Sequence, residues 1–162
     1  MSYLVDGNNV MGQRVGWHRD KAGARRRLLG ELAMFARGAR VSVEVVFDGA
    51  PEDHFPDGAS FMGVRVYYAA RGSNADERIK AFVDNSRERR TLKVVTSDRA
   101  LADYVRRSGA EVVRAGEFRR RLDETSDERT VQTKRQRPAV TSVRELDEWM
   151  HYFGVGPEDD EE

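Results

Sequence analysis

Short hydrophobic runs alternate with longer amphipathic segments along the chain. Five runs rich in valine and tyrosine predict β-strands over residues 2–6, 41–48, 64–69, 92–97 and 111–114. Helical spacing between these runs predicts helices over residues 20–38, 75–86 and 99–107. Strands that alternate with helices are typical of a parallel sheet covered on both faces, so we expect an α/β domain with right-handed crossovers.

The hydrophobic pattern stops after residue 122. The segment "DETSDERTVQTKRQRP" has no apolar face, which indicates a charged loop or linker. Helical spacing returns in "TSVRELDEWMHYF", where Ser142 and Glu145 are in capping-box register and the apolar residues share one side. The predicted organisation is a domain over 1–122, a loop or linker over 123–140, an amphipathic helix over 141–155 that packs on the domain, and a disordered acidic tail over 156–162.

Composition favours a single soluble domain. The chain has 162 residues, of which 35% are charged, and it has no cysteine. The lack of cysteine excludes disulfides, thiolate nucleophiles and cysteine-ligated zinc, and the three histidines lack metal-ligand spacing. No window offers ~18 consecutive apolar residues, and no signal-peptide pattern is present. We therefore expect a cytoplasmic protein without a membrane partner.

The net charge of zero conceals an uneven distribution. The last five residues, Glu158–Glu162, are all acidic, so residues 1–157 carry 28 basic and 23 acidic side chains. This main part of the chain is mildly basic and rich in arginine, the side chain best suited to bidentate contacts with phosphate. Such a small excess of positive charge gives only a limited long-range attraction for polyanions.

Acidic residues follow the predicted strands at the end where ligands bind in open α/β sheets. Asp6 ends the first strand, "VVFDG" places Asp48 after the second, and "VVTSD" places Asp98 after the fourth. "SNADERI" adds Asp76 in the first turn of a helix that begins at the same edge of the sheet. The sequence therefore predicts that carboxylates from four separate segments converge.

Each acid also has a structural explanation. Asp98 could cap the next helix, Asp48 could begin a turn, and Asp76 could complement a helix dipole. Asp6 is harder to explain in this way, because "DGNN" precedes no obvious regular helix and the first strand should be central. Neighbouring strands lie about 4.8 Å apart, so bare carboxylates would repel one another. An all-oxygen cluster without cysteine or histidine favours Mg²⁺ or Mn²⁺ as the compensating ion.

Three other readings of the first loop are less well supported. Gly7 and Gly12 have the G-x-x-x-x-G spacing of a phosphate-binding loop, but Gln13 and Arg14 replace its lysine and hydroxyl residues. The dinucleotide fingerprint G-x-G-x-x-G is absent from this loop. A phosphatase with Asp6 as its nucleophile would usually carry a second acid two residues later, where this chain has an asparagine.

The four acidic motifs resemble those of the PIN-like nucleases, and within them the NYN branch typified by YacP-like bacterial proteins. "LVDGNNVMG" is similar to the family's opening D-G-Y-N motif, "SNADERI" to its T-A-D-x-x-I helix start, and "VVTSDRALA" to its S-D motif. "VVFDG", "AGEF" and the late amphipathic segment also lie where the family has counterparts. One departure is Asn8, which stands where the family commonly has tyrosine.

This resemblance implies a three-layer α/β/α fold with a parallel sheet of about five strands in the order 3-2-1-4-5. It also implies a metal-dependent endoribonuclease that hydrolyses RNA phosphodiester bonds with Mg²⁺ or Mn²⁺. The expected catalytic residues are Asp6, Asp76, Asp98 and Asn9; the expected metal ligands are Asp6, Asp48, Asp76 and Asp98. Ser97 is expected beside Asn9 as an orienting group that contacts substrate.

Candidate RNA contacts lie in loops at the same edge. "QRVGWHRDK" supplies Arg14, Trp17, Arg19 and Lys21, a basic set with an aromatic ring that could stack on a base. Arg71 and Arg99 flank the acidic helix starts. The weak charge of the domain favours RNA presented by a ribosome or another ribonucleoprotein. The alternative function is a catalytically inactive RNA- or ribonucleoprotein-binding module with the same fold, which would need no divalent ion.

Overall fold

The computed structural model describes residues 1–51, 55–69 and 74–135. The strands are β1 (Ser2–Asp6), β2 (Ser42–Phe47), β3 (Ala59–Phe61), β4 (Val64–Tyr68), β5 (Leu92–Val95) and β6 (Glu111–Val113). The α-helices are α1 (Gly7–Met11), α2 (Lys21–Ala39), α3 (Ala75–Asn85), α4 (Arg99–Arg107) and α5 (Ala115–Arg135). Two short 3₁₀ helices, η1 (Trp17–Arg19) and η2 (Arg89–Thr91), complete the described elements.

The strands form one sheet in the order β3-β4-β2-β1-β5-β6. All neighbours are parallel except the edge pair β3 and β4. If β3 is left out and the other five strands are numbered in chain order, their order is the predicted 3-2-1-4-5. The expected fold class is therefore confirmed, and the sheet has one additional strand. Because β1 is paired on both sides, its last residue, Asp6, lies at the centre of the sheet's carboxyl edge.

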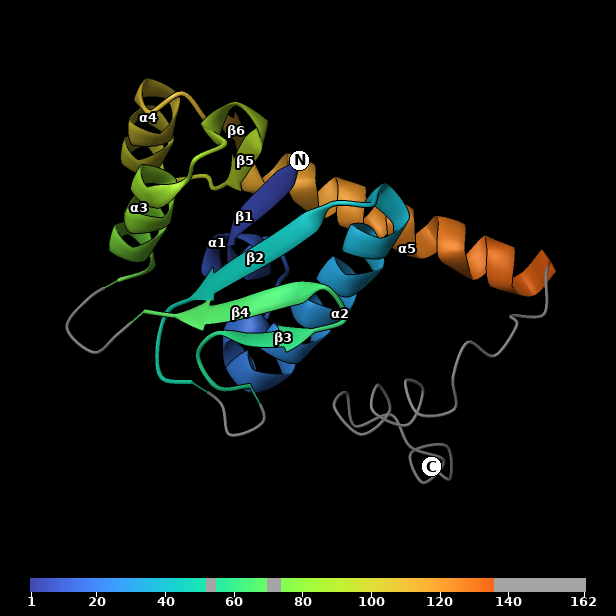
Figure 1. Cartoon of the computed structure of the whole chain (residues 1–162). Helices are drawn as coiled ribbons and strands as arrows, with labels where there is room; N and C mark the ends of the chain where they lie inside the picture. Colours follow the sequence, from blue (N-terminus) through green and yellow to red (C-terminus); the bar gives the residue numbers. More distant parts are fainter. Residues whose placement is uncertain (52–54, 70–73, 136–162) are drawn as a thin grey trace.

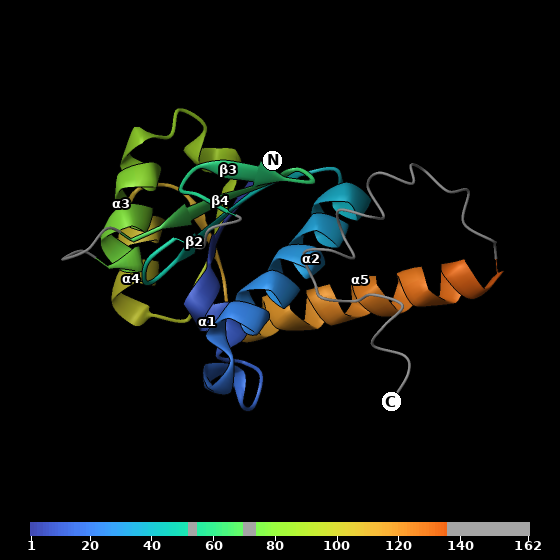
Figure 2. The same ribbon diagram turned by 90° about the horizontal axis from the view of Figure 1, so that it is seen from below.

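Helices cover both faces of this sheet and make three layers (Figures 1 and 2). Helices α1, α2 and α5 lie on one face, and α3 and α4 lie on the other. Alternation along β1 serves both layers: Val5 packs in the core beneath α2 and α5, whereas Leu4 packs in the core beneath α3 and α4. Two buried rings from the helices, Phe35 and Phe118, pack edge to face at 5.2 Å between centroids and hold α2 against α5.

The additional strand β3 is short, which explains why the hydrophobic pattern did not reveal it. Its three residues pair antiparallel with β4 through a two-residue turn at Met62 and Gly63. Both turn residues have positive φ, 47° and 86°, as in the type I′ turns that connect tight hairpins. Only Gly63 matches the usual sequence signal of such a turn, because methionine is rare at positive φ.

Helix α1 corrects the expectation that no regular helix follows Asp6. The helix is a single turn of five residues, and its sequence has poor intrinsic helix propensity because it contains one glycine and two asparagines. Val10 and Met11 are buried against the core, so tertiary packing stabilises this turn. A propensity argument could not have predicted it.

Helix α5 corrects the predicted boundary at residue 122 and the predicted loop over 123–135. The helix begins at Ala115 and runs without interruption to Arg135. The segment lacks an apolar face, but from Glu117 to Arg135 it contains no glycine or proline and is rich in good helix formers. Ion pairs one turn apart support it, including Arg121 with Glu117 at 3.1 Å.

The remaining C-terminal predictions lie outside the described residues. These are the end of the linker at 136–140, the helix over 141–155 and the acidic tail over 156–162. Within the described ranges, no helix combines the length and the apolar character that crossing a membrane requires.

Candidate active site at the carboxyl ends of the strands

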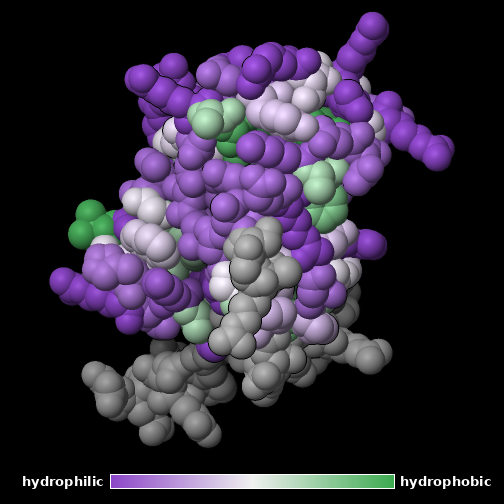
Figure 3. Space-filling model, turned by 90° about the vertical axis from the view of Figure 1, so that its left-hand side faces the viewer, coloured by the Kyte–Doolittle hydropathy of each residue, from purple (hydrophilic) through white to green (hydrophobic). Residues whose placement is uncertain are grey.

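Four aspartates gather where the parallel strands end, as the sequence predicted. Asp6 ends β1 and Asp48 follows β2, whereas Asp76 lies in the first turn of α3 and Asp98 precedes α4. We call these four side chains the carboxylate cluster. Asp6 is only 1% exposed, and the other three are half-buried. The left-hand side of Figure 1, where β2 and β4 end, is predominantly hydrophilic (Figure 3).

The carboxylates of the cluster interact electrostatically. Burial, and then the charges of Asp76 and Asp48, raise the pKa of Asp6 to about 7, although hydrogen bonds with Asn9 and Thr96 act in the opposite direction. The pKa of Asp76 is also raised, first by burial and then by Asp98 and Asp48. The pKa shifts therefore link all four segments, and they show like charges held together, with Lys80 as a cation that partly offsets the charge at Asp76.

Two polar side chains fix the carboxylate of Asp6. Asn9 Nδ2 donates to Asp6 Oδ2 at 2.9 Å, and the Asn9 Oδ1 accepts from the backbone N–H of Ser97 at 2.9 Å. Buried Thr96 donates its hydroxyl to the same Asp6 oxygen at 3.3 Å. The predicted place of Asn9 beside Asp6 thus has a clear basis, because its amide joins the end of β1 to the loop after β5.

Thr96 is a site residue that the sequence reasoning missed. Its hydroxyl contacts Asp6 and also accepts from the backbone N–H of Asp98 at 3.1 Å. It therefore links two members of the carboxylate cluster. Threonine is common in strands for its shape alone, so its position in "VVTSD" carried no distinct signal.

Asn8 joins the ends of β1 and β2, which gives a role to the position where the chain departs from the pattern of the family that it resembles. Its Oδ1 accepts from the backbone N–H of Asp48 at 3.1 Å. Asp48 in turn uses Oδ1 to accept from the backbone N–H of Ala75 at the start of α3, at 2.9 Å. Asparagine at this position therefore contributes a hydrogen bond that helps to hold a cluster member.

Arg25 of α2 is a second residue that sequence reasoning missed. It donates to the backbone carbonyl oxygens of Asp48 and Ala50, and its guanidinium lies 5.5 Å from the centroid of the Phe47 ring. It fixes the chain just after β2 without touching a carboxylate of the cluster. The run of three arginines in α2 gave no indication which of them would point inward.

Close packing explains the glycine after Asp6. A Cβ atom at Gly7 would lie 2.5 Å from the ring of Phe47 and 3.1 Å from the side chain of Val45. Only a residue without a side chain allows β1 to turn directly into α1 this close to β2.

The capping role expected of Asp98 is confirmed alongside the cluster, and Asn74 forms a second cap at the same edge. Asp98 caps α4 by accepting from the backbone N–H of Leu101 at 2.9 Å. Asn74 caps α3 by accepting from the backbone N–H of Glu77 at 2.9 Å. Capping uses only one oxygen of Asp98, so this role is compatible with membership of the carboxylate cluster.

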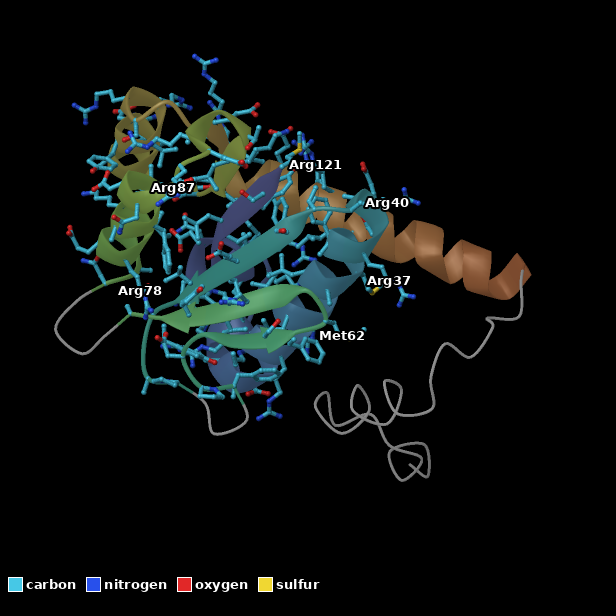
Figure 4. The ribbon with its side chains drawn as sticks, viewed as in Figure 1. Arg37, Arg40, Met62, Arg78, Arg87 and Arg121 are labelled. Atoms are coloured by element: carbon cyan, nitrogen blue, oxygen red, sulfur yellow. The ribbon has the colours of Figure 1, made fainter. Side chains whose placement is uncertain are left out.

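Arg78 holds the start of α3, and with it Asp76, against the end of β4. It makes a bidentate ion pair with Asp57, with distances of 2.7 and 2.9 Å, and it donates to the backbone carbonyl of Tyr68. Its guanidinium also lies 5.0 Å from the ring centroid of Tyr67. In Figure 4 this side chain lies between α3 and β4.

The predicted substrate contacts fall into two groups. Arg14 forms ion pairs with Glu31 and Asp123, and Trp17 packs against the core with Lys21 5.9 Å from its ring centroid. These three therefore already have partners within the fold, whereas Arg19 is exposed. The second group consists of Ser97 and Arg99, which are exposed beside Thr96 and Asp98 at the carboxyl edge. Arg71 lies outside the described residues.

The cluster suits a divalent ion in charge and in donor chemistry. Mg²⁺ and Mn²⁺ prefer oxygen ligands, and all four members keep an oxygen that accepts no side-chain or backbone hydrogen bond from the described part of the chain. These oxygens are Oδ1 of Asp6, Oδ2 of Asp48, both carboxylate oxygens of Asp76 and Oδ2 of Asp98. Within the described ranges, no three acidic, histidine or cysteine side chains already surround one point as metal ligands. The fit therefore lies in the donor set and not in a preformed coordination shell.

Comparisons with known proteins identify the family and the fold of this chain. The sequence matches the family model described as YacP-like NYN domain over residues 3–151. Among solved structures, the chain is similar to Rae1 (YacP) from Bacillus subtilis, with 23% identity, a TM-score of 0.68 and coverage of 99% of this chain and 98% of that one. A tryptophan-to-leucine mutant of the same protein matches with 22% identity, a TM-score of 0.69 and coverage of 94% and 91%. A search of curated proteins gives no match.

Proposed function

Because the chain belongs to the YacP-like NYN domain family, we propose that it is a metal-dependent endoribonuclease that hydrolyses phosphodiester bonds in RNA. The proposed cofactor is Mg²⁺ or Mn²⁺. The proposed catalytic residues are Asp6, Asp76 and Asp98, with Asp48 as a further metal ligand and Asn9 as the residue that orients Asp6.

The observation that carries this proposal is the buried carboxylate of Asp6 among other carboxylates. Its pKa is raised to about 7 because burial and the charges of Asp76 and Asp48 oppose its ionisation. A protein that needed only a stable core could replace this group with a neutral one at no electrostatic cost. A bound dication would turn the same arrangement from a source of repulsion into a ligand set.

Each residue has a defined task in this proposal. Asn9 and Thr96 hold one oxygen of Asp6, which leaves the other oxygen for the ion. Arg78 and Asp48 keep the start of α3 in place, and so they position Asp76. A divalent ion bound here would supply a Lewis acid that activates water and stabilises charge on the phosphoryl group.

No protein nucleophile is part of this proposal. Water is the attacking group, so the proposed products carry 5′-phosphate and 3′-hydroxyl ends. Attack by the ribose hydroxyl would instead leave a cyclic phosphate on the 3′ side. Analysis of the product ends therefore separates hydrolysis from transesterification.

The proposed substrate is RNA presented by a ribosome or another ribonucleoprotein. Residues 1–157 carry only five more basic than acidic side chains, so capture of free RNA by long-range attraction would be weak. Co-sedimentation with ribosomes at moderate salt would support this part of the proposal. Free migration of the protein under all conditions would contradict it without affecting the proposed hydrolysis.

The direct test of the proposed activity is cleavage of a labelled RNA with Mg²⁺ or Mn²⁺ by the parent protein and its Asp6→Asn variant. The variant should lose at least about a hundredfold in rate, the effect typical of removing one electrostatic group from an active site. Glu111→Gln is a matched control, because Glu111 is an exposed acid at the start of β6, at the opposite edge of the sheet. Equal cleavage by the parent and Asp6→Asn would contradict the role proposed for Asp6, and no cleavage by the parent would favour the inactive binding module.

A further inference from the structure

A basic groove adjoins the carboxylate cluster on the side of β5 and β6. It consists of two hollows of about 620 and 460 Å³ that share Ser97 and Arg114. The larger hollow extends to Arg120 of α5, and the smaller extends to Arg99 at the start of α4. We call this the Arg99–Arg114–Arg120 groove.

The groove reaches direct neighbours of the proposed catalytic residues. Thr96 lines the smaller hollow and also donates its hydroxyl to Asp6 at 3.3 Å. Ser97 lines both hollows, and its backbone N–H donates to Asn9. A chain molecule lying in the groove would therefore lie against residues that hydrogen-bond to Asp6 and Asn9.

The positive charges of the groove are not neutralised within the fold. Arg99, Arg114 and Arg120 are exposed, and none makes an ion pair or side-chain hydrogen bond with another described residue. The two acids that line the hollows are engaged elsewhere, since Asp103 pairs with Arg106 at 3.6 Å and Glu117 pairs with Arg121 at 3.1 Å. Three guanidiniums thus line the two adjoining hollows without an ion-pair partner of their own, and Arg114 lines both.

Exposed arginines are commonly only solvated, but four other arginines of the domain are held by partners within the fold. Arg14 and Arg119 are both bound in ion pairs with Glu31 and Asp123. Arg25 and Arg78 are held by backbone carbonyls. Free guanidiniums in a continuous hollow that leads to the cluster indicate an external anion, and guanidinium suits phosphate in particular.

We propose that the Arg99–Arg114–Arg120 groove binds the phosphodiester backbone of single-stranded RNA and leads it to the carboxylate cluster. This inference rests on the proposed nuclease function. The lining contains guanidiniums and hydroxyls but no aromatic ring, so the groove contacts phosphates and does not read bases. Binding should therefore depend strongly on salt and only weakly on RNA sequence.

The test compares two matched pairs of substitutions. Arg114→Ala with Arg120→Ala removes two charges from the groove. Arg37→Ala with Arg87→Ala removes two equally exposed charges from segments that precede β2 and β5, at the amino edge of the sheet. Figure 4 shows Arg37 on α2, away from the arrowheads of β2 and β4. Thermal unfolding of both variants checks that these surface changes leave the fold intact.

Binding of a fluorescent RNA of about 12 nucleotides, a length within the usual site size for single strands, is measured by anisotropy in EDTA. Over about 50 to 200 mM salt, the groove variant should bind at least about tenfold more weakly than the parent. The slope of log K against log salt concentration should fall in magnitude by about 1.4, because each phosphate contact on a single strand contributes about 0.7. The control variant should stay within about twofold of the parent and keep its slope. Lysine at positions 114 and 120 should preserve the slope.

Several outcomes would contradict the proposal that this groove binds RNA. These are no RNA binding by the parent, equal losses of affinity in both alanine variants, or an unchanged salt dependence in the groove variant. A matched single-stranded DNA serves as a second probe, and an equal loss for DNA would support phosphate recognition. Cleavage in Mg²⁺ is measured separately. If the groove variant loses affinity while the parent does not cleave, RNA binding by the groove is supported and the nuclease proposal is wrong. If the parent cleaves and the groove variant keeps its affinity, only the proposal that the groove binds RNA is wrong.

Discussion

Two groups of charged residues in this protein have opposite electrostatic arrangements. The first is the carboxylate cluster. The second, which we call the ion-pair network, joins Arg14 and Arg119 to Glu31 and Asp123 between α2 and α5. In the network each charge faces a charge of opposite sign, with Arg119 only 8% and Glu31 13% exposed. In the cluster, like charges face one another.

The two groups differ in whether their charges are paired with opposite charges within the fold. Burial and the nearby Arg14 lower the pKa of Arg119, but Asp123 opposes this change, so the network keeps its charges through its own residues. In the cluster only Lys80 opposes the repulsion, at Asp76, and the pKa values of Asp6 and Asp76 are both raised. The network is a structural element, whereas like charges with raised pKa values support the proposal that the cluster binds a cation.

The largest expected effect on stability comes from neutralising Asp6. Its folded-state pKa of about 7 lies above the ordinary value of 3.8, so the folded protein binds more protons than the unfolded chain between these pH values. The free energy of unfolding should therefore fall as pH rises from 4 to 7. Asp6→Asn should remove the part of this dependence that Asp6 contributes, and it should be more stable than the parent at pH 8 by up to about 4 kcal/mol, at 1.36 kcal/mol for each unit.

Urea unfolding in EDTA at about pH 5 and pH 8 measures this difference, because the Asp6 carboxyl changes its charge between these values. Glu111→Gln again serves as the control, and its stability should follow that of the parent at both pH values. A free-energy difference between Asp6→Asn and the parent that does not change with pH would show that Asp6 ionises normally.

A smaller effect is expected from breaking the ion-pair network. Glu31→Gln leaves the nearly buried guanidinium of Arg119 with Asp123 as its remaining acidic partner, and it should destabilise the protein by about 2 kcal/mol. Arg14→Gln removes a side chain that is 45% exposed, and it should cost less than about 1 kcal/mol. Urea unfolding at neutral pH compares the two, and equal losses would contradict the distinction between the buried and exposed halves of the network.

The smallest effect should follow from Asn8→Ala. This change removes one hydrogen bond to the backbone N–H of Asp48, and it should lower the free energy of unfolding by about 1 kcal/mol. The pH dependence of stability should remain, since Asn8 does not touch Asp6. A variant that abolished this pH dependence would indicate that the cluster is held together by Asn8 and not by the sheet.

The sequence predicted the features of this site that depend on strand pattern. Valine-rich runs that end in aspartate place Asp6, Asp48 and Asp98 at one edge of a parallel sheet, and that inference needs only the alternation of strands and helices. The family resemblance supplied the strand order, which the fold confirms.

The parts that could not be predicted depend on tertiary contacts. Helix α1 exists because Val10 and Met11 are buried, and its sequence alone favours a loop. Thr96 and Arg25 hold the site through hydrogen bonds to residues far away in the sequence. Helix α5 continues past residue 122 because its polar residues favour a helix, although they give no amphipathic pattern.

The central claim is that the carboxylate cluster is a binding site for a divalent cation. Its most direct test is the free energy of unfolding of the parent, Asp6→Asn and Glu111→Gln at pH 8, with MgCl₂ or MnCl₂ replacing EDTA. At about a hundred times the dissociation constant, the ion should stabilise the parent and Glu111→Gln by about 2.7 kcal/mol and leave Asp6→Asn unchanged. Equal stabilisation of all three proteins, or of none, would contradict the claim.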